Sequence, residues 1–313
     1  MTDVHGFAQP RFDGVKQALA ASLASGADLG ASFAATLDGE PIIDIWGGWA
    51  DAERTRPWEQ DTIVNVYSTT KTMTALTALW LADQGLLDFA RPVAHYWPEF
   101  AAAGKQDVTV AMLMSHSAGL SGFAEPMRAE DIYDWDLCVS RLAAQTPFWQ
   151  PGTAPGYHAL TQGYLVGEVV RRITGKSLGT AFREIFAAPL GADFHIGLPA
   201  SEDDRVAHLV PPPKGAGIAD VSQSELTRNM ATNPAIDPLA TRTRAWRGAE
   251  IPAGGGTGNA RSVAAVQTIM ANGGMAGGKR FLSEAGVARA LEEQIKGLDL
   301  VLNMPVRYGM GYG

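Results

Sequence analysis

The sequence contains one cysteine, Cys138, among 313 residues. An internal disulfide is therefore excluded, and the composition suits a reducing compartment. Basic residues are also few, since 25 Lys and Arg stand against 33 Asp and Glu and give a net charge of −8. They are scattered along the chain, so no basic stripe is available for a phosphate backbone. Nucleic acid is not an expected partner.

Long apolar runs, targeting signals and metal-binding patterns are missing as well. The apolar stretch Ala78–Ala82 is bounded by Thr77 and Asp83, which is far short of the roughly 20 residues of a membrane span. The segment from Met1 to Phe7 has neither the basic nor the apolar part of a secretory signal. The six histidines show no metal-ligand spacing. These features predict a cytoplasmic protein without stable membrane insertion and without a metal site.

Hydrophobic residues make up 46% of the chain, enough to bury a substantial core. Two β-rich segments, Ala31–Leu37 and Pro41–Trp49, flank Asp38-Gly39, which predicts an antiparallel hairpin. Helical periodicity is present before it, from Phe12 to Ser25, and again in Asp131–Gln145 and Leu160–Thr174. Strand signal returns weakly at the end of the chain.

This order predicts an α+β protein whose antiparallel sheet collects strands from both ends of the chain and is flanked by helices. Residues 1–85 and 245–313 are expected to form a mixed sheet and helix lobe. Residues 86–244 are expected to form a helix-rich lobe. A cleft between the lobes is where a binding site is expected.

One Ser-x-x-Lys motif is present, Ser68-Thr69-Thr70-Lys71, where a β-rich segment changes to a helical one. Residues three apart share a helix face, so the Lys71 amine can reach the Ser68 hydroxyl and remove its proton. The positive end of the helix dipole is expected to lower the pKa of Lys71 and to stabilise an oxyanion. The motif alone leaves another interpretation open, in which Ser68 caps a helix and Lys71 is solvated.

Tyr157 is the best available third group for moving protons. It lies in the Pro/Gly-rich stretch from Trp149 to Ala159, a loop of the kind that often presents functional residues. A phenol near a cationic lysine is expected to have a lowered pKa and to act as base and then acid. A packed loop aromatic that caps the next helix is the alternative.

The predicted substrate-binding residues are Trp149, His158, Gly255 and Gly256. The two glycines belong to the run Gly254–Gly258, which predicts a tight turn bordering the cleft and lacks the Gly-Lys-Ser/Thr of a phosphate loop. For Trp149, core packing is as well supported as an acyl pocket. His158, like His116, also fits a hydrogen-bonded loop histidine. Ser115 to Gly119 is close to Gly-x-Ser-x-Gly but lacks the first glycine and follows a predicted helix, so an α/β-hydrolase is a weaker interpretation.

Five motifs in order resemble the serine β-lactamase and penicillin-binding-protein superfamily, and within it most of all the family VIII carboxylesterases, relatives of class C β-lactamases. These motifs are Val66 to Lys71, Leu113 to Leu120, Pro151-Gly152-Thr153 with Tyr157, Gly163 to Glu168 with Thr174-Gly175, and Gly254 to Gly256 before Ala260-Arg261-Ser262. The resemblance extends from about Phe12 to the end of the chain. It implies a β-lactamase-like fold and covalent acyl transfer on Ser68, with Lys71 and Tyr157 as proton relay and no cofactor or metal.

The sequence departs from the family pattern at two places. Ala159 stands where class C enzymes have the asparagine of Tyr-x-Asn, and the loss of that amide favours esters over β-lactams. The family's third motif, a Lys/His/Trp-x-Gly strand beside the nucleophile, has no counterpart before Gly313. A chain ending there is therefore expected to lack C-terminal strands and the second oxyanion donor, to expose a sheet edge, and to be inactive.

The sequence thus predicts a serine carboxylesterase for small-molecule esters of short to medium acyl chain. A β-lactamase or D-Ala-D-Ala peptidase, an acyltransferase with the same residues, and a non-catalytic ligand-binding homologue are the alternatives. The natural ester and the oligomeric state do not follow from the sequence.

Overall fold

The computed structural model describes residues 3–211 and 224–313. An N-terminal layer contains helix α1 (Asp13–Ser25) and strands β1 (Val4–Ala8), β2 (Gly30–Leu37) and β3 (Glu40–Gly48), with the strands in the antiparallel order β1-β3-β2. The predicted hairpin is confirmed. Asp38 and Gly39 both have positive φ, 54° and 85°, as a two-residue turn between twisted strands requires.

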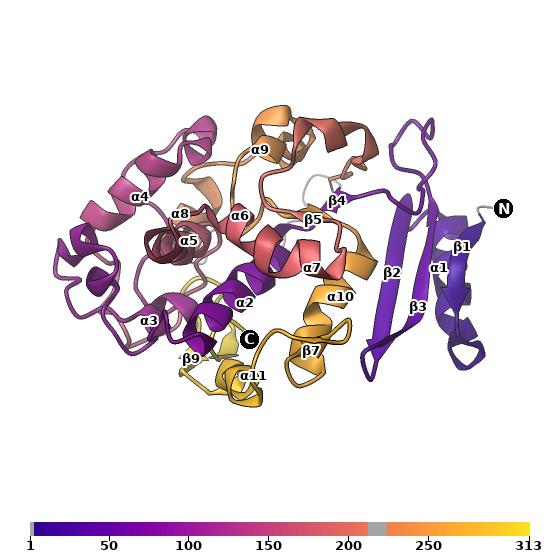
Figure 1. Cartoon of the computed structure of the whole chain (residues 1–313). Coiled ribbons are helices and arrows are strands. Elements are labelled where there is room, and N and C mark those ends of the chain that lie inside the picture. Colours follow the sequence, from indigo (N-terminus) through magenta and orange to yellow (C-terminus); the bar gives the residue numbers. More distant parts are fainter. Residues whose placement is uncertain (1–2, 212–223) are drawn as a thin grey trace.

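The helical part is built around α2 (Thr70–Asp83), which Figure 1 shows near the centre of the molecule. Its apolar residues lie on nearly every side and are buried, and it packs against α5 (Thr161–Thr174), α6 (Leu178–Phe182) and α11 (Glu284–Leu291). The other helices are α3 (Val110–Met114), α4 (Trp135–Ala144), α7 (Ala188–Leu190), α8 (Glu225–Thr232), α9 (Arg244–Gly248) and α10 (Ala260–Ala271). The helices predicted at residues 12–25, 131–145 and 160–174 are present, as is the helix predicted at the Ser68 motif.

A small second sheet next to the start of α2 brings together three distant parts of the chain. Strands β4 (Val64–Asn65), β6 (Thr257–Gly258) and β5 (Phe194–His195) lie in the order β4-β6-β5. The glycine run therefore does more than turn, since its last two residues form the middle strand. Glycine at position 258 allows β6 to pair closely with β5, because a Cβ there would lie 2.6 Å from the Phe194 ring.

The expectation that one sheet collects strands from both ends of the chain is wrong for the residues that the structure describes. Strands β9 (Ile295–Leu298) and β10 (Pro305–Tyr308) pair with each other, and β7 (Met275–Ala276) pairs with β8 (Lys279–Arg280). None of the four joins β1-β3-β2. The C-terminal hairpin instead packs near the loop that precedes α5, through a hydrogen bond from Leu300 N to Pro155 O of 2.9 Å.

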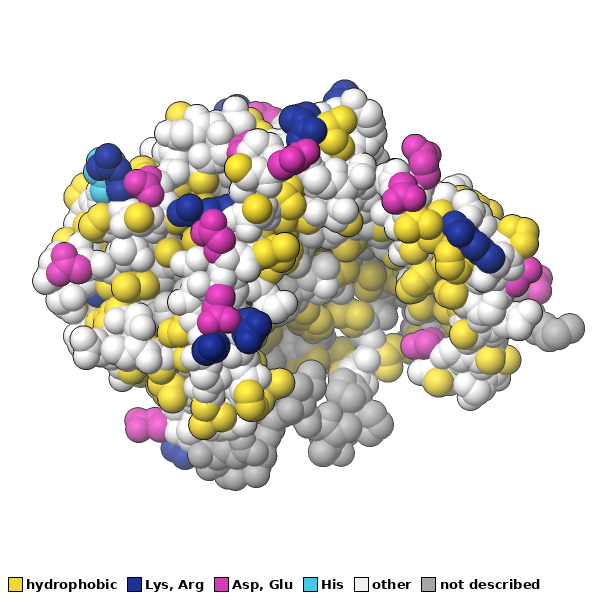
Figure 2. All heavy atoms as spheres, turned by 90° about the horizontal axis from the view of Figure 1, so that it is seen from below, with side chains coloured by type: hydrophobic (Ala, Val, Ile, Leu, Met, Phe, Trp, Pro, Cys, Tyr) yellow, Lys and Arg dark blue, Asp and Glu magenta, His cyan; other side chains and the backbone are white. Residues whose placement is uncertain are grey.

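The largest hydrophobic core runs from Met73 in α2 through α5 to Met310. It therefore continues across both boundaries proposed from the sequence, at residues 85 and 245, and the division into lobes stays a prediction. The N-terminal layer has a smaller core of its own, in which Ile43 and Ile45 face α1. Figure 2 shows the molecule hollowed between this layer and the helical part, with hydrophobic side chains on both walls.

Two polar contacts connect the N-terminal layer to α10 beside that hollow. The Arg261 guanidinium pairs with Asp44 at 2.9 Å, and the hydroxyls of Thr36 and Thr268 lie 2.8 Å apart. Within residues 3–211 and 224–313, no helix combines the length and apolar character needed to cross a bilayer.

Candidate active site

Ser68 lies in a sharp connection between β4 and α2. Tyr67–Thr69 form a single 3₁₀ turn, and Tyr67 has a φ of 43°, a left-handed conformation that is costly for a bulky residue. Two side chains hold this turn, since Asn65 Oδ1 accepts from Tyr67 N at 3.3 Å and Thr70 Oγ1 donates to Tyr67 O at 2.5 Å. Ser68 is consequently exposed, and it lies just before α2, where the sequence predicts that a helix begins.

Lys71 lies one turn further along, with its side chain buried beneath Ser68. Its Nζ atom is 3.1 Å from Ser68 Oγ and donates to the carbonyl oxygens of Ala159 at 2.7 Å and Ala253 at 2.9 Å. A neutral amine has two N–H bonds and one lone pair. With the two N–H bonds directed at the carbonyls, the lone pair faces the Ser68 hydroxyl, which is the orientation that a base requires.

Burial lowers the pKa of Lys71 to about 7. The direction agrees with the prediction from the helix dipole, but the cause is loss of water around the ammonium, with no carboxylate paired to it among the described residues. A substantial fraction of Lys71 is then neutral near pH 7. The solvated lysine left open by the sequence does not describe this side chain, which is 7% exposed.

Tyr157 completes the cluster from the opposite side. Its hydroxyl donates to Ser68 Oγ at 2.7 Å, and Lys71 Nζ lies 4.9 Å from the centre of its ring. The expectation of a lowered phenol pKa is wrong, because burial raises the pKa of Tyr157, opposed by the hydrogen bond to Ser68 and assisted by Asp299. A lysine that is itself partly neutral supplies little positive charge to the phenol. The Tyr157 hydroxyl is therefore protonated at neutral pH.

Two buried, neutral histidines, His116 and His158, form hydrogen bonds that hold the loop containing Tyr157. The His158 ring accepts from Leu120 N through Nε2 at 3.1 Å, and its Nδ1 lies 2.6 Å from Gly156 O. The backbone N–H of His158 donates to His116 Nδ1 at 3.0 Å. Burial lowers the pKa of His158 to about 4 and that of His116 well below its ordinary value. His158 is 0% exposed, so its placement favours the loop-histidine interpretation over direct substrate contact.

Trp149 packs inside the same loop. Its Nε1 donates to Ala154 O at 3.0 Å, and its ring lies against His158 with centroids 5.9 Å apart. A Cβ on Gly156 would lie 2.4 Å from this ring, which explains why glycine precedes Tyr157. These contacts favour a packing role for Trp149.

Gly255 and Gly256 are both buried, which favours a packing role over substrate contact. Gly256 N donates to Thr70 Oγ1 at 2.9 Å, and Gly256 O accepts from Val66 N at 2.9 Å. Gly256 thus forms hydrogen bonds to the residues on both sides of the turn that contains Ser68. Ala253, the residue just before the glycine run, accepts a hydrogen bond from Lys71 through its carbonyl oxygen.

Replacing Gly256 by alanine is expected to lower the free energy of unfolding by about 1–3 kcal/mol. A Cβ there would lie 2.4 Å from Thr70 Oγ1 and 2.7 Å from the Phe194 ring. Denaturant unfolding measures the change. Gly254→Ala is the matched control, because its Cβ would meet only Leu160 Cδ2, at 3.8 Å. Equal stability of the two variants would contradict the close packing behind Ser68.

The second serine motif is not an exposed nucleophile. Ser115 is buried at the end of α3, and its hydroxyl donates to Ala111 O at 2.8 Å. The weaker α/β-hydrolase interpretation therefore finds no support in the geometry.

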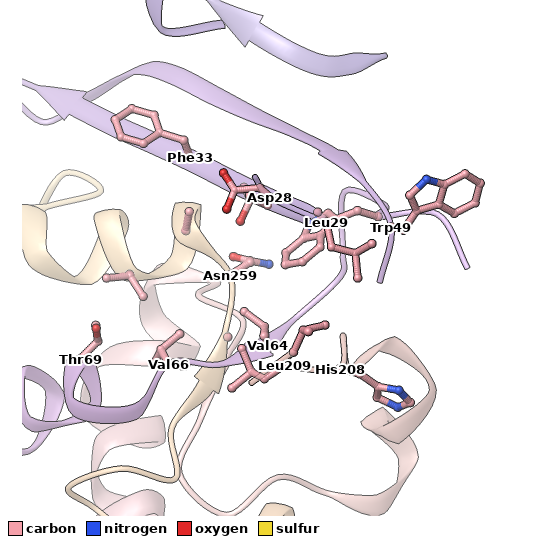
Figure 3. Close-up of a pocket in the computed structure, with 18 of the residues that line it drawn as sticks. Asp28, Leu29, Phe33, Trp49, Val64, Val66, Thr69, His208, Leu209 and Asn259 are labelled. Carbon is pink, nitrogen blue, oxygen red and sulfur yellow. The ribbon is translucent and has the colours of Figure 1, made fainter. Parts of the chain in front are cut away.

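A groove of about 810 Å³ opens beside the site (Figure 3). Strand β2 lies on one side of it, and strand β4 and the start of helix α10 lie on the other. Phe33 and Leu29 line one wall, Val64 and Val66 line the other, and Thr69 stands at one end. Ser68, Lys71 and Tyr157 are not among its lining residues. The groove is adjacent to the nucleophile but is separate from the Ser68 cluster.

Sequence reasoning missed three parts of the site. The carbonyls of Ala159 and Ala253 that orient Lys71 are backbone atoms, which no residue pattern reveals. Asp299, which accepts from Tyr157 N at 3.1 Å, lies 142 residues away from it in the chain and has no local motif.

Comparison with known proteins identifies the family of the chain. The Beta-lactamase family model matches residues 15–313. Esterase/beta-lactamase LipL of Mycobacterium tuberculosis (strain ATCC 25618 / H37Rv) is 36% identical over 99% of this chain and 74% of its own length. A crystal structure of a family VIII carboxylesterase is similar with a TM-score of 0.93 and 47% identity, covering 99% of this chain and 82% of that one.

A penicillin-binding protein homologue from Caulobacter crescentus is also similar, with a TM-score of 0.89 and 39% identity over 99% of this chain and 82% of that chain. The α+β, β-lactamase-like fold predicted from the sequence is confirmed. The chain belongs to the β-lactamase family, and its resemblance to the family VIII carboxylesterases within that family is confirmed.

Proposed function

We propose that this protein is a serine hydrolase that cleaves short- to medium-chain carboxylic esters through an acyl-enzyme on Ser68. The observation that supports this most is the position of Ser68 Oγ, which lies 3.1 Å from Lys71 Nζ and 2.7 Å from Tyr157 Oη. An exposed hydroxyl between a partly neutral amine and a protonated phenol is suited to attack a carbonyl and to have a leaving group protonated.

In the first half of the reaction, Ser68 Oγ forms a bond to the ester carbonyl carbon as its proton passes to the neutral Lys71 amine. The negative charge collects on the carbonyl oxygen, where the Ser68 N–H is the expected first donor of an oxyanion hole. The carbon–oxygen bond to the alcohol then breaks, and Tyr157 gives its proton to the departing oxygen. The resulting phenolate regains a proton from the Lys71 ammonium, since both groups lie beside Ser68 Oγ, at 2.7 and 3.1 Å.

The second half repeats these transfers with water. Lys71, neutral again, accepts a proton from water as the water oxygen attacks the acyl carbon, and the tetrahedral species collapses by breaking the bond to Ser68 Oγ. Ser68 recovers its proton from the relay and the carboxylic acid leaves. No cofactor enters these steps.

Ala159 supports esters as the preferred substrates. Its carbonyl is used by Lys71, and its methyl side chain offers no amide to hold the amide group of a β-lactam. The names of the relatives agree, since LipL is described as an esterase/beta-lactamase and the 47%-identical structure as a carboxylesterase. β-Lactam hydrolysis is the second candidate, and the name of LipL together with the penicillin-binding protein homologue favours it over the remaining alternatives.

The proposal predicts hydrolysis of a nitrophenyl butyrate with turnover, and little or none of a chromogenic cephalosporin under the same conditions. Both reactions are followed by absorbance with the full-length protein. Faster cephalosporin hydrolysis would replace the ester proposal by the second candidate. Failure of Ser68 to react with a fluorophosphonate probe would favour a non-catalytic binding protein.

A further inference from the structure

We propose that Asp299 is a positioning residue that holds Tyr157 in place for proton transfer at Ser68. This inference rests on the proposed function, since it assigns a role in the same reaction to a residue outside the Ser68 cluster. It concerns the connection between β9 and β10, a part of the chain to which the motifs of the site do not extend.

Tyr157 lies in a segment without regular secondary structure, so specific contacts must hold its backbone. The residues from Ala154 to Ala159 contain no helix or strand, so regular secondary structure does not fix the backbone that carries the phenol. Yet Tyr157 Oη must stay within hydrogen-bonding reach of Ser68 Oγ, 2.7 Å away. A displacement of the order of 1 Å in a reacting group can cost about 100-fold in rate.

Asp299 supplies the support through a fully buried carboxylate. Its Oδ1 accepts from Tyr157 N at 3.1 Å, and also from Val301 N at 2.9 Å and Leu302 N at 2.8 Å, while its Oδ2 accepts from the Tyr308 hydroxyl at 3.1 Å. The side chain is 0% exposed and makes no ion pair among the described residues. Burying a carboxylate without a cation is costly unless hydrogen bonds satisfy it, and here four donors do so.

The same segment makes one further hydrogen bond to the Tyr157 loop, and β10 adds an aromatic contact to His116. Leu300 N donates to Pro155 O at 2.9 Å, two residues before Tyr157. The Tyr308 ring lies 5.0 Å from His116, whose ring lies 5.0 Å from that of Tyr157. The Tyr157 ring therefore lies against His116, while the β9–β10 connection holds the backbone of its loop, with Asp299 making the one hydrogen bond to the backbone N–H of Tyr157 itself.

The geometry separates a positioning role from a direct chemical one. Asp299 touches the backbone of Tyr157 and neither Ser68 nor Lys71 in the contacts of the described residues. Its removal should move or loosen Tyr157 without changing the nucleophile. An asparagine should replace it well, because the amide oxygen can accept from the same three N–H groups and the amide nitrogen can donate to Tyr308.

The test measures nitrophenyl ester kinetics on the full-length protein, with kcat expressed per site that reacts with a fluorophosphonate. Asp299→Ala is expected to lower kcat about 10- to 100-fold with KM changed less than about threefold. Asp299→Asn is expected to restore most of that loss. Asp51→Ala is the matched control, because Asp51 is also a buried carboxylate that fastens a loop, through Thr55 N at 2.8 Å, but belongs to another part of the molecule. It should lose stability and keep kcat per active site.

A double-mutant cycle with Tyr157→Phe gives the decisive result. If Asp299 acts through Tyr157, Asp299→Ala should cost little further kcat in the Tyr157→Phe protein. Full additivity of the two losses, or an unchanged kcat per active site in Asp299→Ala, would overturn the inference while leaving the proposed function intact. Absence of ester turnover and probe labelling in the wild-type protein would overturn the proposed function, and this inference with it.

Discussion

Replacing Ser68 by alanine is expected to lower ester turnover on the order of 10⁴- to 10⁶-fold, the scale of loss when a covalent nucleophile is removed. The hydroxyl lies between Lys71 Nζ and Tyr157 Oη, and no neighbouring group in the cluster can replace it as the attacking atom. Steady-state hydrolysis of a nitrophenyl ester measures the loss. Labelling by a fluorophosphonate should disappear in the same variant.

Ser115→Ala is the matched control for this prediction. Ser115 lies in the other serine motif, but its hydroxyl is buried and donates to Ala111 O. Turnover per folded protein should stay within about threefold of the wild type, as for substitutions outside the reacting groups. A Ser68→Ala protein that kept full activity, with loss of activity in Ser115→Ala, would reverse the assignment of the nucleophile.

Lys71→Ala is expected to cost on the order of 10²- to 10⁴-fold in kcat, the usual contribution of a general base. In the wild type, kcat/KM should rise with pH through about 7, because burial lowers the pKa of Lys71 to about 7 and only the amine that has lost its proton can accept one from Ser68. Lys71→Arg should lose activity at every pH below about 10, since a guanidinium does not lose its proton in this range.

Lys105→Ala tests whether that pH dependence belongs to Lys71. Lys105 is a second buried lysine whose pKa is lowered by burial, to about 8, and it also donates to a backbone carbonyl, that of Ala102 at 2.9 Å. It lies away from the Ser68 cluster, so its removal should reduce stability and leave the rise near pH 7 in place. A wild-type profile that stays flat from pH 5 to 9, with chemistry limiting the rate, would contradict a lysine base.

The parts of the site that the sequence predicted are those set by local geometry. Ser68 and Lys71 are three residues apart at the start of one helix, so the helical repeat alone brings them together. The Asp38-Gly39 hairpin and the α5 helix followed from short-range patterns in the same way. The Pro/Gly-rich composition of its loop and the family motifs identified Tyr157 as a candidate site residue.

The parts that the sequence could not predict depend on burial and on contacts between distant segments. The cause of the lowered pKa of Lys71 is loss of water, and the raised pKa of Tyr157 follows from the same burial. His158 looked able to contact substrate because it is next to Tyr157, but the loop directs its ring inward, to Leu120 N. The separate pairing of β9 with β10 likewise depends on tertiary contacts that weak strand propensity does not reveal.

Trapping the acyl-enzyme tests the central claim most directly. The full-length protein is mixed with a nitrophenyl ester, quenched in acid within one turnover and digested, and the peptides are analysed by mass spectrometry. The account predicts one acyl group, attached to Ser68 in the peptide that contains Ser68 and Lys71, and no acylation of Ser68→Ala. An acyl group on another residue, or full turnover with no covalent intermediate under conditions where deacylation limits the rate, would contradict it.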